Sequence, residues 1–322
     1  MGGCVYLITS YTNPEQVSRL VTLLRRSSPG CHVVIHHDEA RTHLDRAPLV
    51  ALGNVQVLET DRPIGWGTFR YVEVILRLLR WTVENLEFDW AALLSGQDYP
   101  IQPLPEIERA LAASPYDGFL EHFPLPEGGP WNPDEGLRRY FYHYYRLPLP
   151  SQLVPRDGSR DGAVGGLARE LREAQPWLSF KRGPVIPGLY VGLRCRRTPF
   201  DAGLRCYGGS DWWTMSARSA RYVDRFVRDN PAYVRHYRRT WVPSESFITT
   251  ILLNNPELRI YNGNLRYFRF PSDDASNPRV LTSDDLGSML SSGLQFARKF
   301  DMKVDAKVLD VLDQLQGNSM PR

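Results

Sequence analysis

The chain has 322 residues, of which 42% are hydrophobic, so it can bury the core of one large domain or two modest ones. Its net charge is only +3, and acidic and basic residues alternate along most of the chain, which argues against a nucleic-acid-binding protein. No apolar run approaches the roughly 20 residues of a membrane-spanning helix. Because a strand-like segment opens the chain where a signal segment would stand, we expect a cytoplasmic globular protein.

The first 123 residues alternate between apolar strands and amphipathic helices. Strands are predicted at Val5–Ser10, His32–His37, Gly53–Glu59, Trp90–Leu94 and Asp117–Glu121, and helices at Pro14–Arg26, Phe69–Leu86 and Pro103–Ala112. Such alternation is typical of an α/β fold with a mostly parallel sheet, in which ligands bind at the carboxyl ends of the strands. The polar residues that end these strands are therefore expected around one crevice.

The pattern weakens over residues 124–186, where Pro and Gly are frequent. PRDGSRDGAVGG at 155–166 has the composition of a mobile loop, and the segment could cover a site. Its tyrosine-rich part, Arg138–Arg146, could stack on a sugar, although packing explains it more simply. We expect three parts of one continuous domain: a nucleotide-binding half (1–123), a connecting or lid segment (124–186), and an acceptor-binding and catalytic half (187–322).

The last part again predicts strands and helices in alternation. Strands are predicted at Pro187–Leu193, Gly208–Ser216 and Leu265–Phe270, and helices at Ala217–Arg228, Ser244–Leu253, Ser283–Leu290 and Asp305–Leu315. The four cysteines show no C-x-x-C spacing, so we expect reduced thiols, with a bridge between Cys195 and Cys206 as an alternative.

The stretch 241–252, WVPSESFITTIL, places one carboxylate at the start of a predicted helix. Ser244 is a typical N-cap, which makes Glu245 the first or second helical residue. There the helix dipole favours an ionised carboxylate, and Trp241 and Phe247 could shield it from water. Glu245 suits a general base, although an ordinary first-turn acid would show the same local pattern.

Other residues suit the transfer of a sugar from a nucleotide, which needs a base, positive charge for the departing diphosphate and a nucleotide pocket. Asp211, beside Trp212 in GGSDWW, is a second acid suited to binding an acceptor. Arg298 and Lys299 form a cationic pair within the apolar QFARKFD, in a chain with only four lysines. The pair could hold a diphosphate or could extend into solvent at a domain edge.

No D-x-D triplet occurs in the chain. Because such a triplet commonly holds a divalent metal on the diphosphate, we expect neutralisation by Arg and Lys and no metal cofactor. The only metal-like cluster is His36, His37 and Asp38. Adjacent residues of a strand point to opposite faces of the sheet, so these three cannot easily bind one metal together. We interpret it as a pocket edge where Asp38 accepts from a nucleotide base or ribose; a strand-end cap is an equal alternative.

Six segments in a fixed order carry a family resemblance: VVIHHDEA, IGWGTF, WAALLSGQDYPI, GGSDWWTMS, VPSESFITTIL and QFARKFD. The chain resembles the core-2/I-branching β-1,6-N-acetylglucosaminyltransferase family (glycosyltransferase family 14), which also contains peptide O-xylosyltransferases. The resemblance implies a GT-A type nucleotide-sugar-binding fold and an inverting, metal-independent transfer of GlcNAc or xylose from a UDP-sugar. The absence of the animal members' signal anchor and disulfides indicates a bacterial relative.

The resemblance also implies roles for individual residues. Glu245 would be the general base, and Asp211 would contact the acceptor. Donor binding would involve Ser10, Asp38, Ile64, Gly65, Trp66, Arg298 and Lys299. The acceptor side or pocket would involve Asp98, Trp212 and Arg279, the last of which would also help to offset the diphosphate charge. Two positions depart from the family. Ser244 stands where branching enzymes have Asp, and this small residue makes the chain more similar to the xylosyltransferases. Phe270 stands where the family usually has Trp.

Two other functions fit the same residues. A glycoside hydrolase could place Asp211 and Glu245 around a glycosidic bond, and a non-catalytic module could bind a nucleotide-sugar. In the transferase hypothesis the partners are a UDP-sugar and an unidentified glycan, peptide or small-molecule acceptor. UDP-sugars differ by single groups that only the shape of a pocket distinguishes, so the donor stays open.

Overall fold

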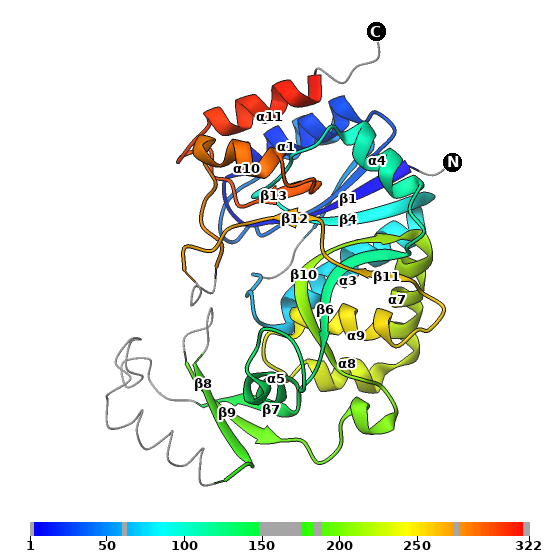
Figure 1. Cartoon of the computed structure of the whole chain (residues 1–322), viewed down its shortest axis with the longest axis vertical. Coiled ribbons are helices and arrows are strands. Elements are labelled where there is room, and N and C mark those ends of the chain that lie inside the picture. The colour runs from blue at the N-terminus through cyan, green and yellow to red at the C-terminus, as the bar shows by residue number, and fades with distance from the viewer. Residues whose placement is uncertain (1–2, 60–62, 148–174, 183–187, 273–276, 318–322) are drawn as a thin grey trace.

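The computed structural model describes residues 3–59, 63–147, 175–182, 188–272 and 277–317 (Figure 1). The strands are β1 (Gly3–Ser10), β2 (His32–His37), β3 (Val55–Leu58), β4 (Phe88–Ser95), β5 (Asp98–Pro100), β6 (Gly118–Pro124), β7 (Tyr142–Arg146), β8 (Leu178–Arg182), β9 (Leu189–Arg194), β10 (Tyr207–Ser216), β11 (Ile260–Asn262), β12 (Arg266–Tyr267) and β13 (Phe296–Arg298). The α-helices are α1 (Pro14–Ser27), α2 (Ala47–Val50), α3 (Phe69–Asn85), α4 (Leu104–Ala112), α5 (Pro133–Tyr140), α7 (Ala217–Asp229), α8 (Pro231–Tyr237), α9 (Phe247–Leu253), α10 (Leu286–Leu290) and α11 (Lys307–Gly317). Short 3₁₀ turns are η2 (Pro199–Ala202), η3 (Pro243–Glu245) and η4 (Ser283–Asp285).

A seven-stranded sheet in the order β11-β6-β10-β4-β1-β2-β3 forms the centre of the molecule (Figure 1). It is mixed and mostly parallel, because only β10 runs antiparallel to its neighbours β4 and β6. The predicted α/β class is confirmed. Ser10 at the end of β1 pairs with His37 of β2, and Thr9 pairs with Ser95 of β4. The polar carboxyl ends of these three strands therefore meet at one edge of the sheet, as the sequence predicts.

Helices cover both faces of the sheet, with α1, α4 and α11 on one face and α3, α7 and α9 on the other (Figure 1). Side chains of β1 alternate between the two cores: Tyr6 and Ile8 enter the first, and Val5 and Leu7 enter the second. The sheet is thus buried on both sides, which fixes the positions of the strand ends that carry the polar residues. None of the helices in the described ranges is long and apolar enough to span a membrane.

Two three-stranded sheets flank the central one. In β12-β13-β5, Arg298 stands opposite Asp98, so QFARKFD lies against SGQDYP. The other, β7-β9-β8, contains much of the tyrosine-rich segment, where Tyr140 and Tyr142 are buried and pack as expected. The loop predicted at 155–166 lies outside the described residues, and the division at 123 and 186 stays a prediction.

Three predicted elements differ from the structure by more than a shift of their ends. The helix predicted over Ser283–Leu290 is the η4 turn followed by α10. The helix predicted from Ser244 is instead the η3 turn followed by α9, which begins only at Phe247 because Ser246 leaves the helical conformation (φ −141°). Ser244 is therefore not an N-cap, and its hydroxyl instead lies beside the Asp211 carboxylate. The strand predicted over 265–270 shortens to β12, because Leu265 adopts a left-handed conformation (φ 58°).

Candidate functional site

A cavity of about 560 Å³ opens at the carboxyl ends of β1 and β4. Its walls come from these ends, the 63–68 loop, β10, the η3 turn and the segments around β13. Eight of the twelve predicted site residues line it: Ser10, Ile64, Trp66, Asp211, Trp212, Glu245, Arg298 and Lys299. The structure therefore brings together residues that are up to 289 positions apart in the sequence, between Ser10 and Lys299.

Glu245 lies at the end of the η3 turn, and its side chain is 20% exposed. The guanidinium of Arg139 donates to its Oε2, and Arg139 is itself fixed by Glu135 (Nη2–Oε1 2.6 Å) and by the Trp131 ring, 4.1 Å away. Burial raises the pKa of Glu245 to about 7; Arg139 opposes this shift, and the Asp211 carboxylate adds to it. A carboxylate with a pKa near neutrality is suited to accept a proton and release it again.

Asp211 enters the cavity from an irregularity in β10. On β10, Gly209 pairs with His122 of β6 and Trp213 pairs with Leu120, so three residues centred on Asp211 face a single residue of β6. Such a bulge re-aims side chains. Trp66 Nε1 donates to Asp211 Oδ2 (3.3 Å), and the Ser244 hydroxyl lies beside the same carboxylate. Burial raises the pKa of Asp211 above its ordinary value, and the hydrogen bonds from Ser244 and Trp66 oppose this shift.

Two cations of the cavity, Arg298 and Lys299, differ in how firmly other side chains fix their positions. The Arg298 guanidinium lies 4.0 Å from the Trp212 ring centre, and its Nε is 3.2 Å from Asp98 Oδ1. Asp98 is fully buried and does not line the cavity. It also accepts from the Ser95 amide, so its carboxylate is held in place and fixes the position of Arg298. Lys299 makes no ion pair with any described residue. Arg298 is thus preorganised, and the Lys299 ammonium is available to an anion.

Besides Asp98, three further predicted site residues do not line the cavity. Asp38 is fully buried and accepts from the amides of Ile64 (2.8 Å) and Ala40 (3.2 Å), so it anchors the 63–68 loop. Gly65 contributes its carbonyl to the Thr68 hydroxyl within the same loop (2.7 Å). The Arg279 side chain pairs with Asp285 (Nη1–Oδ2 2.9 Å) and does not line the cavity. The neighbouring residues Asn277 and Pro278 do line it.

Sequence analysis missed several residues around the cavity. Arg41 lies in its wall near Asp38 (3.8 Å), and Tyr71 of α3 contributes a hydroxyl that contacts Thr9 (3.4 Å). Arg139, which holds Glu245, comes from α5. Arg41 could have been found as the first cation after the predicted strand end at His37. Arg139 has no such signal, because its contact spans 106 positions of the sequence.

The model of the core-2/I-branching enzyme family matches residues 5–161. Xylosyltransferase 2 of Canis lupus familiaris is 32% identical over 313 residues, covering 89% of this chain and 31% of the relative. The chain belongs to the core-2/I-branching family. Its α/β architecture, with a mixed, mostly parallel sheet flanked by helices, agrees with the GT-A fold expected of that family.

Other members of the core-2/I-branching family are similar to parts of the chain. Xylosyltransferase 1 of Canis lupus familiaris is 25% identical over 309 residues, covering 88% of this chain and 28% of the relative. Beta-glucuronosyltransferase GlcAT14B of Arabidopsis thaliana is 29% identical over 149 residues, covering 42% of this chain and 33% of the relative. The chain therefore spans about a third of the length of these relatives.

Proposed function

We propose that the chain is an inverting glycosyltransferase that moves a sugar from a UDP-sugar to an acceptor hydroxyl, with Glu245 as the general base. The observation that carries the proposal is the shared cavity. A carboxylate with a pKa near 7 lies in the same space as the fixed cation Arg298 and as Lys299, which forms no ion pair with the described residues. A base and an anion site in one cavity are what the transfer of a sugar from a diphosphate requires.

In the proposed reaction, the ionised Glu245 takes the proton of the acceptor hydroxyl. The hydroxyl oxygen forms a bond to the anomeric carbon while the bond from that carbon to the diphosphate breaks on the opposite face. The electron pair of the broken bond stays on UDP, and the configuration inverts. Arg298 and Lys299 stabilise the charge that grows on the diphosphate. Glu245 ends protonated and is reset by solvent.

Asp211 and the aromatic side chains are proposed to orient the acceptor and the sugar. Asp211 lines the cavity, and its carboxylate has acceptor sites beyond those used by Trp66 and Ser244, so it can accept from a sugar hydroxyl. Trp66 is 36% exposed at the cavity, and such a ring can pack on a sugar face. The site needs no divalent metal in this proposal, because side-chain cations supply the positive charge.

The names of the relatives suggest which donors to test. The relatives that match almost the whole chain are named xylosyltransferases, and those that match less of it are named glucuronosyltransferases. We therefore propose UDP-xylose as the first donor, with UDP-GlcNAc and UDP-glucuronate as the comparisons. The acceptor is proposed to be a hydroxyl of a glycan, peptide or small molecule.

The test is a thermal-unfolding panel with EDTA present, using UDP, the three UDP-sugars, ADP and GDP. A ligand that binds only the native state must raise the melting temperature. We expect UDP species to do so, Lys299→Ala to reduce the effect, and the matched exposed variant Lys303→Ala to retain it. Preferred donors then enter an acceptor screen that follows UDP release. No stabilisation by any UDP species would overturn the proposal and favour a glycoside hydrolase, which needs no nucleotide site.

A further inference from the structure

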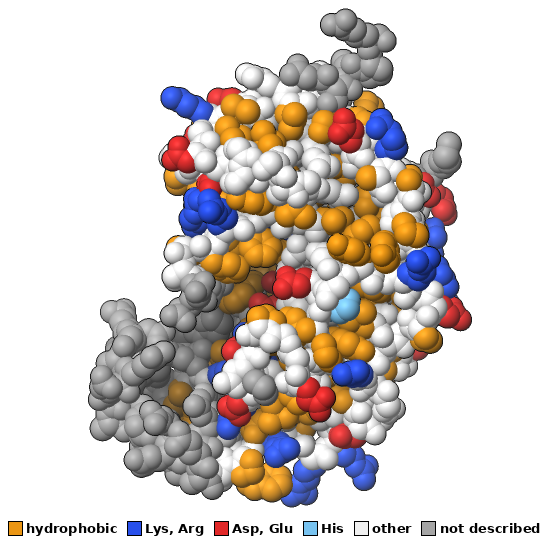
Figure 2. Space-filling model, in the orientation of Figure 1, with side chains coloured by type: hydrophobic (Ala, Val, Ile, Leu, Met, Phe, Trp, Pro, Cys, Tyr) orange, Lys and Arg blue, Asp and Glu red, His pale blue; other side chains and the backbone are white. Residues whose placement is uncertain are grey.

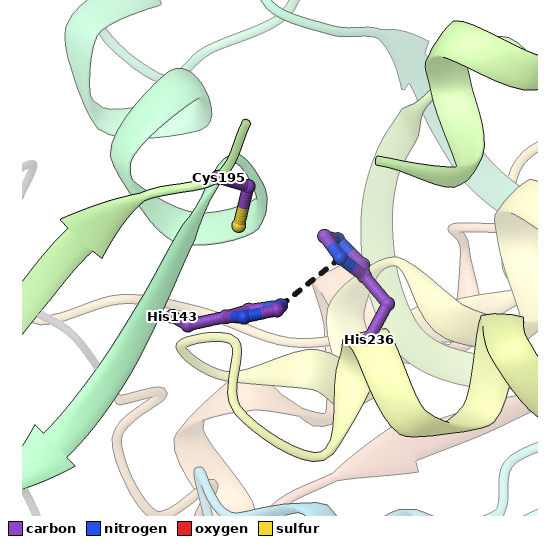
Figure 3. A group of neighbouring side chains, drawn as sticks. All are labelled: His143, Cys195 and His236. Carbon is purple, nitrogen blue, oxygen red and sulfur yellow. Dashed lines mark hydrogen bonds between the residues drawn. The ribbon is translucent and has the colours of Figure 1, made fainter. Parts of the chain in front are cut away.

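Outside the cavity, three side chains with metal-binding atoms converge (Figure 3). His143 comes from β7, Cys195 follows β9 directly, and His236 comes from α8. One nitrogen of each imidazole and the sulfur of Cys195 lie within 4.8 Å of one another. His143 Nε2 and His236 Nδ1 are 3.1 Å apart and face each other (Figure 3). None of the three lines the cavity.

The hydrogen bonds of His236 define which nitrogen is available. Its Nε2 lies 2.9 Å from the backbone carbonyl of Tyr140, which can only accept, so Nε2 carries the proton. Nδ1 therefore presents its lone pair to His143 and Cys195. A histidine that binds a metal through one nitrogen and donates from the other to a backbone carbonyl is a recurring arrangement.

We propose that His143, Cys195 and His236 form a binding site for Zn²⁺. Two imidazole nitrogens and one thiolate are a donor set that zinc prefers, with a solvent molecule as the fourth ligand. For tetrahedral zinc, bonds of about 2.0–2.3 Å place neighbouring ligand atoms roughly 3.3–3.8 Å apart, close to the observed convergence. Binding releases the thiol proton of Cys195 to solvent. The proton that His143 Nε2 donates to His236 Nδ1 moves to His143 Nδ1 by exchange with solvent, so that both facing nitrogens present a lone pair to the metal.

The position of the site suggests a structural role. The ligands tie the edge of the β7-β9-β8 sheet to α8, and they are 52 and 41 positions apart along the chain. The Cys195 amide already donates to the Phe141 carbonyl (2.9 Å), so the backbone holds Cys195 beside β7 before any metal binds. His143 and Cys195 are only partly buried, which leaves a route for the ion. Binding to the folded state alone would stabilise the protein.

Cobalt substitution tests the site on the full chain without using activity. We expect one equivalent of Co²⁺ to produce a sulfur-to-cobalt charge-transfer band together with visible bands of a tetrahedral site, and Zn²⁺ to displace them. Cys195→Ser should remove the charge-transfer band, and His143→Gln should weaken binding at least tenfold. The matched control His43→Ala, at an exposed histidine, should bind like the wild type.

Thermal unfolding supplies the second measurement. Zn²⁺ should raise the melting temperature of the wild type and of His43→Ala, and should leave that of Cys195→Ser unchanged. Equal melting temperatures of wild type and Cys195→Ser in chelator would establish that the variant folds. A wild type without the charge-transfer band, or a Cys195→Ser protein that retains it, would overturn the proposal.

Discussion

At the scale of single residues, the protonation of Glu245 decides when the proposed base is active. Its pKa is about 7, and only the ionised form accepts a proton. We therefore predict that kcat/KM rises about tenfold per pH unit below pH 7 and levels off above it. Glu245→Gln should lose about 10²- to 10⁴-fold of the rate and this pH dependence, while its stabilisation by UDP stays intact. Initial rates of UDP release across the pH range measure both effects.

A control and a contrary result accompany this prediction. Glu257→Gln changes an exposed carboxylate that pairs with Arg218 (3.3 Å) and does not line the cavity, so this variant should keep the wild-type profile. If Glu245→Gln turned over at a near-normal rate, the assignment of the base would be wrong.

The same residue links function to stability. The pKa of Glu245 is about 7 in the folded protein against an ordinary value of 4.5, so between these values the folded state binds more protons than the unfolded state. The free energy of unfolding then falls as pH rises through this window, by at most about 3 kcal/mol from this group. Glu245→Gln lacks the titration. We predict that its melting temperature rises relative to wild type between about pH 5 and pH 8; parallel curves would contradict the burial of the charge.

At the scale of elements, the bulge in β10 presents Asp211 and Trp212 to the cavity. A Cβ atom added to Gly209 would overlap the backbone oxygen of Glu121 on β6, so only glycine fits there. We predict that Gly209→Ala destabilises the protein by about 1–3 kcal/mol and weakens donor binding, because the strand must shift. Gly287→Ala, where the added atom meets nothing within 4 Å, is the control. Denaturant unfolding measures the stability, and UDP titration measures the donor binding. If Gly209→Ala had the stability and the UDP affinity of the wild type, the bulge would not determine the position of Asp211.

The regular elements were predictable because their periodicity is local. The predicted β2 (His32–His37) is identical to the observed strand, and α3 differs by one residue at its end. The η3 turn was not predictable, because Ser244 and Pro243 resemble a helix start and the conformation of Ser246 depends on its tertiary contacts. There the Ser246 hydroxyl bonds to Tyr237 (2.8 Å), a contact that the local pattern does not contain.

The site could be predicted only in part, for the same reason. Glu245, Asp211, Arg298 and Lys299 stand in distinctive motifs, and the structure brings them into one cavity. His36 and His37 resemble a metal site in the sequence because they are adjacent. In the structure, however, both nitrogens of His37 are hydrogen-bonded, one to the Ser10 hydroxyl (2.8 Å) and the other to the Thr42 carbonyl (2.6 Å). The convergent His143, Cys195 and His236 are separated by dozens of residues, and no spacing rule reveals them.

At the scale of the whole molecule, basic and acidic side chains are scattered among one another over the face drawn in Figure 2, without a continuous patch of one sign. This distribution agrees with the proposal that an anionic substrate binds inside the cavity. The two proposed sites also use different parts of the fold. The proposed diphosphate cations Arg298 and Lys299 lie at the end of β13, while the proposed metal ligands come from β7, from the residue after β9 and from α8.

One residue connects the two sites. The Tyr140 carbonyl accepts from His236, and the Tyr140 hydroxyl donates to the Val242 carbonyl (3.1 Å), directly before the η3 turn that carries Glu245. Arg139, the partner of Glu245, precedes Tyr140 in α5. We therefore expect a metal that fixes His236 to hold both the proposed base Glu245 and its partner Arg139 in place, without effect on the proposed diphosphate cations.

This connection predicts that the proposed zinc site affects the rate of transfer but not the binding of UDP. Removing zinc should lower kcat by about 2- to 30-fold, as expected for a coupling of about 0.5–2 kcal/mol, and should leave the UDP-induced shift in melting temperature unchanged. Cys195→Ser should reproduce the loss and should then be insensitive to EDTA. If EDTA still inhibited Cys195→Ser, or abolished the UDP shift, the metal would act on the diphosphate, and the metal-independent mechanism would be wrong.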